Sequence, residues 1–191
     1  MFYILIHLFV QLQSRNFSSI LNIFKYIHNF DIQNIAKVLK LWIANKPENR
    51  ISDVNSIEAI ANKEIFGDKH FSENKNSRKQ VALIESENID KYNLNSNTKI
   101  PYLDFRRNIV TKGIKLNDLL NKQITIGNIK LLGKDLCRPC RHLQELLGYN
   151  NIVKEFLLKG GLRCEIINSG TIYLNDEIKI WIEIKKVVKI P

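Results

Sequence analysis

Alternating apolar and polar positions run through much of the second half of the chain and predict short β-strands. Residues 123–126 and 129–132 show this alternation on either side of Gly127-Asn128, a two-residue turn whose glycine accepts a positive φ. These two segments therefore predict a β-hairpin. Isoleucines at every second position over residues 178–184 predict a further half-buried strand, because successive side chains of a strand point to opposite sides.

A second hairpin is predicted further along the chain. Residues 163–167 and 171–174 show strand-like alternation, and Asn168-Ser169-Gly170 joins them as a turn. Shorter β-prone runs lie earlier, at residues 38–43, 57–60 and 81–84. Many short strands separated by turns favour a mainly β fold, a closed or curled antiparallel β-barrel, over a doubly wound sheet.

Helical periodicity is limited to a few segments. Over residues 18–35 apolar positions recur at three- and four-residue spacing, which predicts a helix with one apolar face. Short helices are also predicted at residues 141–147 and 152–159, the second of them ended by Gly160-Gly161. Ser86 is expected to cap another short helical turn.

Length and charge limit the class of protein. A chain of 191 residues that is 45% apolar can close one main hydrophobic core. The formal net charge of +10 is concentrated in residues 101–191, which hold 16 Lys or Arg against 9 Asp or Glu. These cations occur one or two at a time, whereas nucleic-acid-binding arms carry dense basic runs. We therefore do not expect nucleic acid to be the main partner.

The first residues and the cysteines bear on location. Residues 1–12 are apolar, but they lack a basic start, a cleavage site and the roughly 20 residues that span a bilayer. The polar face of residues 18–35 holds few cations, so we expect at most a weak peripheral membrane contact. Three cysteines late in the chain do not make the disulfide framework of a secreted protein, and we expect a cytoplasmic protein.

The most unusual stretch is Leu-Cys-Arg-Pro-Cys-Arg-His-Leu at residues 136–143. It places Cys137 and Cys140 three residues apart among three potential cations, where a strand ends and a helix begins. Nearby positive charge and the free N–H groups of a helix start both favour thiolate over thiol. Such a thiolate can ligate a soft metal, attack a disulfide or carry sulfur.

Other interpretations of these cysteines stay open at this point. One or both can be small buried hydrophobes, as isolated cysteines often are. Thioredoxin-like exchange would need a helix-bearing parallel arrangement around the motif, and a hairpin precedes it here. A zinc site lacks a second paired motif, and its ligands would be Cys137, Cys140, His142 and Cys164.

The residues around the cysteine stretch, taken in order, resemble one known family. The segments that carry the resemblance are residues 65–70 (Ile-Phe-Gly-Asp-Lys-His), 78–85, 105–119, 126–127, 136–143, 159–163 and 170–172. Together they resemble the MOSC family, the domain found at the C-terminus of molybdenum cofactor sulfurases. The resemblance runs from about residue 37 to about residue 184. It predicts a MOSC domain over residues 37–191, preceded by an N-terminal helical extension over residues 1–36.

The resemblance implies a β-barrel-like fold that binds a molybdenum-pterin cofactor, molybdopterin. The family's invariant cysteine follows a proline, so Cys140 takes the role of metal ligand or sulfur carrier, and of catalytic residue. Lys69 stands where the family usually has arginine. The residues expected to bind the cofactor are Gly67, Asp68, Lys69, Arg106, Arg107, Asn108, Thr111 and Arg163.

The chemistry of these residues suits such a ligand. Arginines grip phosphate in a bidentate manner, while an amide such as Asn108 can donate and accept at a pterin edge. Neighbours on a strand face opposite ways, so we expect only one of Arg106 and Arg107 to face the pocket. The same reasoning makes either Arg163 or Cys164 the inward residue.

Related members of the family reduce N-hydroxylated compounds. The leading hypothesis is therefore a molybdenum-dependent oxidoreductase that acts on a small-molecule substrate. An electron-donor protein is expected as a partner, because the sequence shows no second redox motif. One alternative is a non-catalytic carrier of sulfur or cofactor that uses a Cys140 persulfide. Another is a basic nucleic-acid-binding module in which the cysteines are structural.

Overall fold

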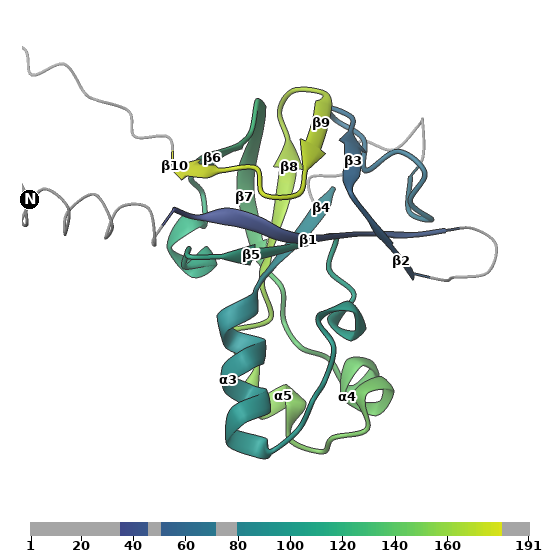
Figure 1. The fold of residues 1–191 in the computed structure, drawn as a ribbon, viewed down its shortest axis with the longest axis vertical. Helices are drawn as coiled ribbons and strands as arrows, with labels where there is room; N and C mark the ends of the chain where they lie inside the picture. Colours follow the sequence, from purple (N-terminus) through teal and green to yellow (C-terminus); the bar gives the residue numbers. More distant parts are fainter. Residues whose placement is uncertain (1–34, 46–50, 72–79, 181–191) are drawn as a thin grey trace, which may run out of the picture. The chain divides into compact units, whose positions relative to one another are not determined.

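The computed structural model describes residues 35–45, 51–71 and 80–180. Eight of the strands in these ranges form one curled sheet, in the order β10-β6-β7-β8-β4-β5-β1-β2, and two more, β3 and β9, pair as a separate ribbon (Figure 1). The strands are β1 (Lys37–Ala44), β2 (Ile51–Val54), β3 (Ser56–Ala59), β4 (Val81–Glu85), β5 (Ile109–Lys112), β6 (Gln123–Ile126), β7 (Ile129–Leu136), β8 (Leu162–Ile166), β9 (Gly170–Tyr173) and β10 (Ile178–Ile180).

Backbone contacts between β1 and the start of β10 curl the sheet into a partial barrel. The amide of Val38 donates to the carbonyl of Asp176 at 2.9 Å, and the amide of Ile178 donates to the carbonyl of Ala36 at 2.7 Å. The expected mainly β, curled fold is thus confirmed. The predicted N-terminal helix lies outside the described residues, apart from its last position.

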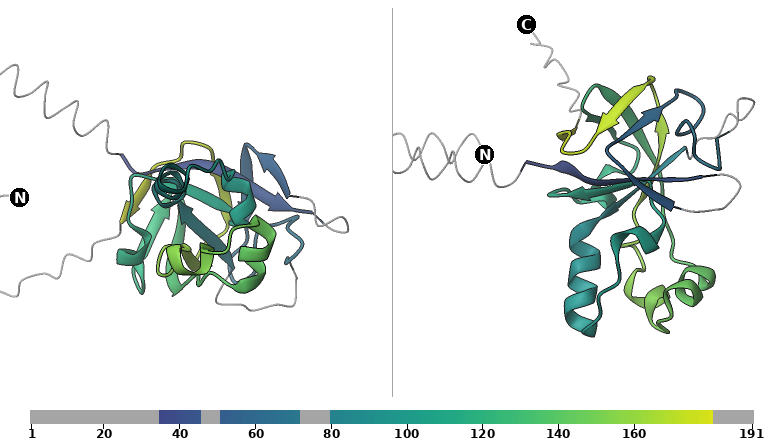
Figure 2. Two further views of the ribbon diagram at one scale, coloured as in Figure 1. Left: turned by 90° about the horizontal axis from the view of Figure 1, so that it is seen from below. Right: turned by 45° about the vertical axis from the view of Figure 1, so that its right-hand side comes forward.

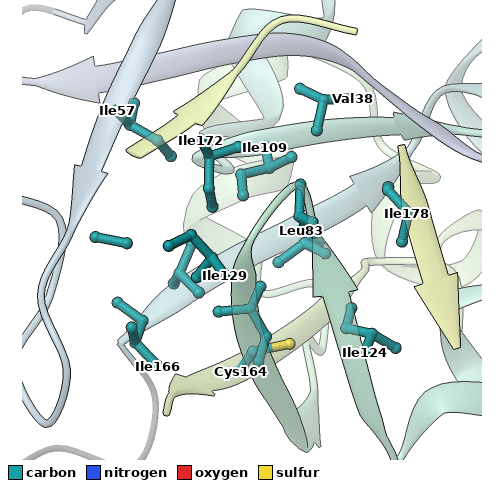
Figure 3. Packing of buried hydrophobic residues seen from close by; sticks show 14 of the residues in the cluster. Val38, Ile57, Leu83, Ile109, Ile124, Ile129, Cys164, Ile166, Ile172 and Ile178 are labelled. Carbon is teal, nitrogen blue, oxygen red and sulfur yellow. The ribbon is translucent and has the colours of Figure 1, made fainter. Parts of the chain in front are cut away.

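The interior of the barrel is filled by aliphatic side chains from nearly every strand. Figure 3 shows Leu83, Ile109, Ile129 and Cys164, which come from four different strands and point into the same space. All four are fully buried. Burying a large aliphatic side chain contributes about 1.5–3 kcal/mol, so this cluster is the main source of the barrel's stability.

The helices gather at one end of the sheet, as the views in Figures 1 and 2 show. A second apolar cluster joins them to the sheet, with Phe156 at its centre: its ring centroid lies 4.6 Å from that of Phe105 and 5.4 Å from that of Tyr92. No helix in the described ranges has the length and apolar character needed to cross a membrane. The elements joined by this cluster are α3 (Ser86–Ser96), α4 (Arg141–Leu147), α5 (Ile152–Glu155) and the 3₁₀ turn η2 (Tyr102–Phe105). The 3₁₀ turn η3 (Leu116–Leu119) instead packs its two leucines into the barrel core.

Strand pairing differs from the sequence prediction in two places. The β6–β7 hairpin forms as expected, but β8 and β9 do not pair with each other, because β9 pairs with β3. Asn168 explains this, since its side chain accepts the amide of Lys130 at 2.7 Å and so fastens the turn to the start of β7. In addition, β4 and β5 are parallel, because the connection between them includes α3 rather than a tight turn.

The helix limits were only partly predicted. Helix α4 has the expected bounds, whereas α5 ends at Glu155, well before Gly160-Gly161. The expected cap at Ser86 is wrong: Glu85 occupies the N-cap position, and the Ser86 hydroxyl bonds to the carboxylate of Glu87 at 3.2 Å. Ile180 is exposed, so the alternation predicted for the last strand holds only at Ile178 within the described residues.

Glu85 makes the stability of this fold depend on pH. Its carboxylate accepts the amide of Leu116 at 2.5 Å, and burial raises its pKa above the ordinary value of 4.5. The folded protein therefore keeps this proton to higher pH than the unfolded chain does. The stabilisation is present below about pH 4.5 and is lost as the pH rises through the raised pKa.

We expect Glu85→Gln to flatten this part of the pH profile, because the amide oxygen still accepts from Leu116 but does not ionise. Urea-unfolding midpoints measured from acidic to neutral pH test this. Glu58→Gln, at an exposed carboxylate, serves as the control and is expected to follow the wild type. Parallel profiles for the Glu85→Gln variant and the wild type would contradict the assignment.

Candidate functional site

A cavity of about 370 Å³ opens where β1 ends and where β4 and β5 begin. This volume lies within the range of small-molecule sites in proteins, roughly 300–1,000 Å³. The residues that line it come from six separate stretches of the described chain. They are Trp42, Ala44, Ile51, Glu64, Ile65, Asp68, Lys69, His70, Gln80, Val81, Ala82, Arg106, Arg107, Asn108 and Arg163.

The lining combines cations with apolar side chains. Lys69, Arg106, Arg107 and Arg163 contribute four formal positive charges, and two acidic residues also line the cavity. Coulomb attraction to several cations at one cavity favours an anionic ligand. The apolar lining residues can pack on an uncharged body of that ligand, and they are Trp42, Ile51, Ile65 and Val81.

Both neighbouring arginines line the cavity, contrary to the expectation that only one would. The reason is local, since Arg106 is not in a strand but follows η2 with a φ of +55°. Arg107 is held from two sides: its Nε donates to the carbonyl of Gly160 and its Nη1 to the carbonyl of Phe105, both at 3.0 Å. A guanidinium has five N–H donors, so Arg107 keeps donors for a ligand.

On β8, Arg163 is the residue that faces the cavity. Its Nη1 lies 3.5 Å from the carboxylate of Asp135 on the neighbouring strand β7. Cys164, the next residue, points into the barrel core, where burial raises the pKa of its thiol. Because neighbours on a strand face opposite sides, Arg163 faces the cavity and Cys164 packs in the barrel core.

Asp68 and Asn108 line the cavity, but they also form several hydrogen bonds within the protein itself. The carboxylate of Asp68 accepts the amide of Ala44 at 3.1 Å, the amide of His70 at 3.0 Å and Nδ2 of Asn108 at 3.4 Å. Oδ1 of Asn108 accepts the amide of Ala82 at 3.1 Å. The pair therefore ties the end of β1 to the starts of β4 and β5 and fixes one wall of the cavity.

Asp68→Asn is expected to destabilise the protein by about 1–3 kcal/mol, because an amide cannot accept all three donors that the buried carboxylate serves. The free energy of urea unfolding measures this. Asp53→Asn is the matched control, since Asp53 forms only an exposed ion pair with Lys40 at 3.0 Å. That control is expected to cost less than about 1 kcal/mol. Equal losses of unfolding free energy in the two variants would show that the hydrogen bonds of Asp68 stabilise the protein no more than the exposed ion pair of Asp53 does.

Of the remaining predicted site residues, Lys69 lines the cavity, whereas Gly67 and Thr111 do not. The amide of Lys69 donates to the carbonyl of Ala44, at 2.6 Å, in the segment that lines the cavity. Gly67 has a φ of +78° and shapes the turn before Asp68, but it does not line the cavity. Thr111 is fully buried in β5, where its hydroxyl donates to the carbonyl of Ile84 at 3.2 Å, so it too lies outside the cavity.

Sequence reasoning missed several residues that line the cavity. Trp42 was hidden among the apolar positions of a predicted strand, and Gln80 stood just before another. Glu64 directly precedes the motif at residues 65–70, and that adjacency was the only signal that could have marked it. Trp42 is the aromatic residue of the lining, and its indole ring is almost fully buried.

Cys137 lies beside the arginines of the cavity. It is buried, and its amide donates to the carbonyl of Gly161 at 2.8 Å. Burial raises the pKa of this thiol, although Arg107 and Arg163 oppose the shift. Cys137 is therefore a buried thiol close to two of the cavity's arginines.

Cys140 is the exposed cysteine of the three. It occupies the N-cap position of α4 in an extended conformation, and its side chain makes no capping hydrogen bond. Cys140 does not line the cavity. Its loop contacts Gly160, which in turn binds the cavity residue Arg107. Gly160 packs against the carbonyl of Cys137 and near the ring of Pro139, and its own carbonyl holds Arg107.

These placements narrow the interpretations of the cysteines. In the described ranges, no three or more His, Cys, Asp or Glu side chains come together as metal ligands. The proposed zinc set is not assembled, because Cys164 sits in the barrel core while Cys140 is exposed. The interpretation as buried hydrophobes fits Cys137 and Cys164 and does not fit Cys140.

The fold and the site together define a curled β-barrel domain with a cationic ligand cavity and an exposed cysteine on the adjoining loop. A family model for the MOSC domain matches residues 64–179, well over half of the 191 residues. The chain belongs to the MOSC domain family, which is associated with molybdenum cofactor-related function. No curated protein matches the chain.

Solved structures of similar fold come from several bacteria. The YuaD protein from Bacillus subtilis has a TM-score of 0.65 and 20% sequence identity, with 76% of this chain and 94% of that chain covered. YiiM from Geobacillus stearothermophilus gives a TM-score of 0.61 at 12% identity, with 77% and 75% covered. YiiM from Escherichia coli gives 0.57 at 12% identity, with 78% and 71% covered. At these identities the likeness establishes the fold.

Proposed function

We propose that this domain binds the molybdenum cofactor in the cationic cavity, with Cys140 as the ligand of the metal, and reduces N-hydroxylated compounds. The observation that carries the proposal is the convergence of four cations on one cavity beside the loop that bears the exposed cysteine. Two of these arginines, Arg107 and Arg163, also flank the buried thiol of Cys137 on that same loop.

The donor chemistry of the residues present suits the cofactor's phosphate, ring system and metal, with Cys140 outside the cavity lining itself. Its phosphate would be held by Lys69, Arg106, Arg107 and Arg163, since guanidinium groups match phosphate geometry. Its ring system would pack on the apolar lining around Trp42. A cysteine thiolate is a good soft ligand for the metal, and the side chain of Cys140 has no capping hydrogen bond to give up.

When bound, the cofactor supplies two-electron chemistry at a metal with an exchangeable oxygen position. In the proposed reaction the N–O bond of the substrate breaks, two electrons and two protons are taken up, and an amine and water are formed. The electrons must come from another protein, because the chain has three cysteines and no second redox motif. Three free thiols suit a reducing compartment, and we propose the cytoplasm.

The exposure of Cys140 favours one alternative function. A thiol outside the cavity can hold a sulfur atom as a persulfide and present it to a second protein. In that case the domain would be a carrier of sulfur or cofactor rather than an enzyme. Such a protein would hold cyanide-labile sulfur and would not turn over an N-hydroxylated base.

Elemental analysis tests the proposal on protein made in a host that produces the cofactor and in a matched host that does not. Stoichiometric molybdenum from the first host alone, together with turnover of an N-hydroxylated base, is the expected result. If the protein is metal-free and holds cyanide-labile sulfur, the carrier function replaces the enzyme function. Metal-free protein whose binding to DNA or RNA is steeply salt-dependent and survives Cys140→Ser would overturn both.

A further inference from the structure

The corner formed by α4, α5 and the residues just after α5 exposes a large share of the molecule's apolar side chains. In the described part of the chain, twelve large hydrophobic side chains are exposed, and five of these fall within residues 146–158. Single exposed apolar residues are ordinary, whereas grouped ones mark interaction sites. We name this group the α4–α5 corner, and it consists of Leu146, Tyr149, Val153, Leu157 and Leu158.

Charges around the α4–α5 corner are mainly positive. Over residues 137–159 there are four Lys or Arg against two Glu. Glu145 and Arg141 are paired with each other at 3.2 Å and offset one another, and the second acid, Glu155, is partly buried. Positive charge surrounding exposed apolar side chains favours a partner whose contact surface is acidic. The exposed cations outside that pair are Arg138, Lys154 and Lys159.

The corner begins close to Cys140. Helix α4 starts at the residue after Cys140, and Leu146 lies six positions further on. At a rise of 1.5 Å per residue this is about 9 Å along the helix axis. Figure 1 shows α4 beside α5 at the helical end of the domain. A protein seated on the corner would therefore lie about one length of α4 away from the exposed cysteine.

We propose that the α4–α5 corner is the docking surface for an acidic electron-donor protein. This protein supplies the two electrons that the reduction of one N-hydroxylated molecule consumes. The inference rests on the proposed function, which requires an external reductant, and it adds where the reductant binds and which charge its surface carries.

Two other occupants suit the corner less well. A second copy of this chain would bring the same cations face to face, and like charges oppose such a contact. A lipid surface favours a helix that presents one long apolar face. Here α4 has seven residues and turns Leu143 into the domain's own core, and α5 has four residues.

Two variants of the holoprotein test the corner, with an acidic plant-type ferredoxin as the probe. Leu157→Ser combined with Leu158→Asn removes apolar surface, and asparagine tolerates the φ of +60° at position 158. Lys154→Glu combined with Lys159→Glu reverses charge. Lys112→Glu combined with Lys130→Glu is the control, with the same change in net charge at exposed lysines of β5 and β7.

We expect the wild type to bind ferredoxin less tightly as salt rises, and each corner variant to bind at least about tenfold more weakly. The control should stay within about twofold, because rim charges act locally at moderate salt. Turnover with a small chemical reductant such as reduced viologen should be the same in all variants, because only docking is altered. In the corner variants, the KM for ferredoxin should rise.

Several results would overturn the inference. These are equal weakening in the control, self-association that the corner variants abolish, or corner-dependent binding to vesicles of phosphatidylserine. Metal analysis of the same preparations separates the two proposals. If the protein contains molybdenum but the corner variants bind ferredoxin as the wild type does, only the docking surface is wrong. If the protein lacks molybdenum but ferredoxin binding still depends on the corner, the proposed reaction is wrong and the docking surface stands.

Discussion

Replacement of Cys140 by serine is expected to remove molybdenum from the protein and to leave the fold intact. The side chain of Cys140 is exposed and makes no capping hydrogen bond, so its sulfur contributes little to folding. A serine hydroxyl stays protonated at neutral pH and is a hard donor, which makes it a poor substitute for thiolate. Changes outside the direct ligands already cost 10–100-fold in metal affinity, so we expect at least about a tenfold loss of bound molybdenum.

Elemental analysis and thermal unfolding of the same samples check this result. Cys164→Ala is the matched control, because it removes a thiol from the barrel core rather than from the surface. It should lower stability by about 1 kcal/mol or more and keep its molybdenum. Full molybdenum content and turnover in Cys140→Ser would remove the proposed role of Cys140 and, with it, the proposed function.

The sequence allowed most of the sheet to be predicted, because several strands, such as β6 and β8, alternate between buried and more exposed positions. The β6–β7 hairpin has both the alternation and a two-residue glycine turn, and both signals are local. Pairing between distant strands has no local signal. The link from Asn168 to Lys130 that directs β9 away from β8 joins residues far apart in the chain, and alternation alone cannot reveal it.

The structure brings most of the predicted site residues together. Six of the nine predicted site residues line one cavity: Asp68, Lys69, Arg106, Arg107, Asn108 and Arg163. Thr111 lies outside the cavity because the strand that begins at Ile109 carries it into the core, and Gly67 does so because it shapes the turn before Asp68. The third, Cys140, sits on the adjoining surface. The positive φ of Arg106, which lets two neighbouring arginines share the cavity, follows from packing of η2 and not from sequence alone.

One close approach connects the cavity, the cysteine loop and the sheet. Gly160 holds Arg107 through its carbonyl and packs against the carbonyl of Cys137, and Gly161 lies directly against the carbonyl of Leu83 on β4. A side chain at either glycine would overlap one of these carbonyls. The position of Arg107 therefore depends on two residues without side chains, which the sequence marked as a helix end and as part of the MOSC-like segment at residues 159–163.

Replacement of Gly161 by alanine is accordingly expected to cause the largest loss of stability among single glycine variants near the site. Its φ of +105° disfavours any side chain, at a cost of about 1–2 kcal/mol. Overlap of the new Cβ with the Leu83 carbonyl adds roughly 1–3 kcal/mol, because rigid backbone must shift. The sum is a large part of the total stability of a typical domain, about 5–15 kcal/mol.

Gly148→Ala separates these two costs. Gly148 also has a positive φ, +75°, but nothing lies within 4 Å of a Cβ placed there, so only the backbone cost of about 1–2 kcal/mol is expected. Urea-unfolding free energies of both variants measure the difference, and insoluble Gly161→Ala beside soluble Gly148→Ala points the same way. Equal losses would mean that the loop can move away from β4 at no cost. In that case the close approach at Gly161 would not be what fixes Arg107 beside the cysteine loop.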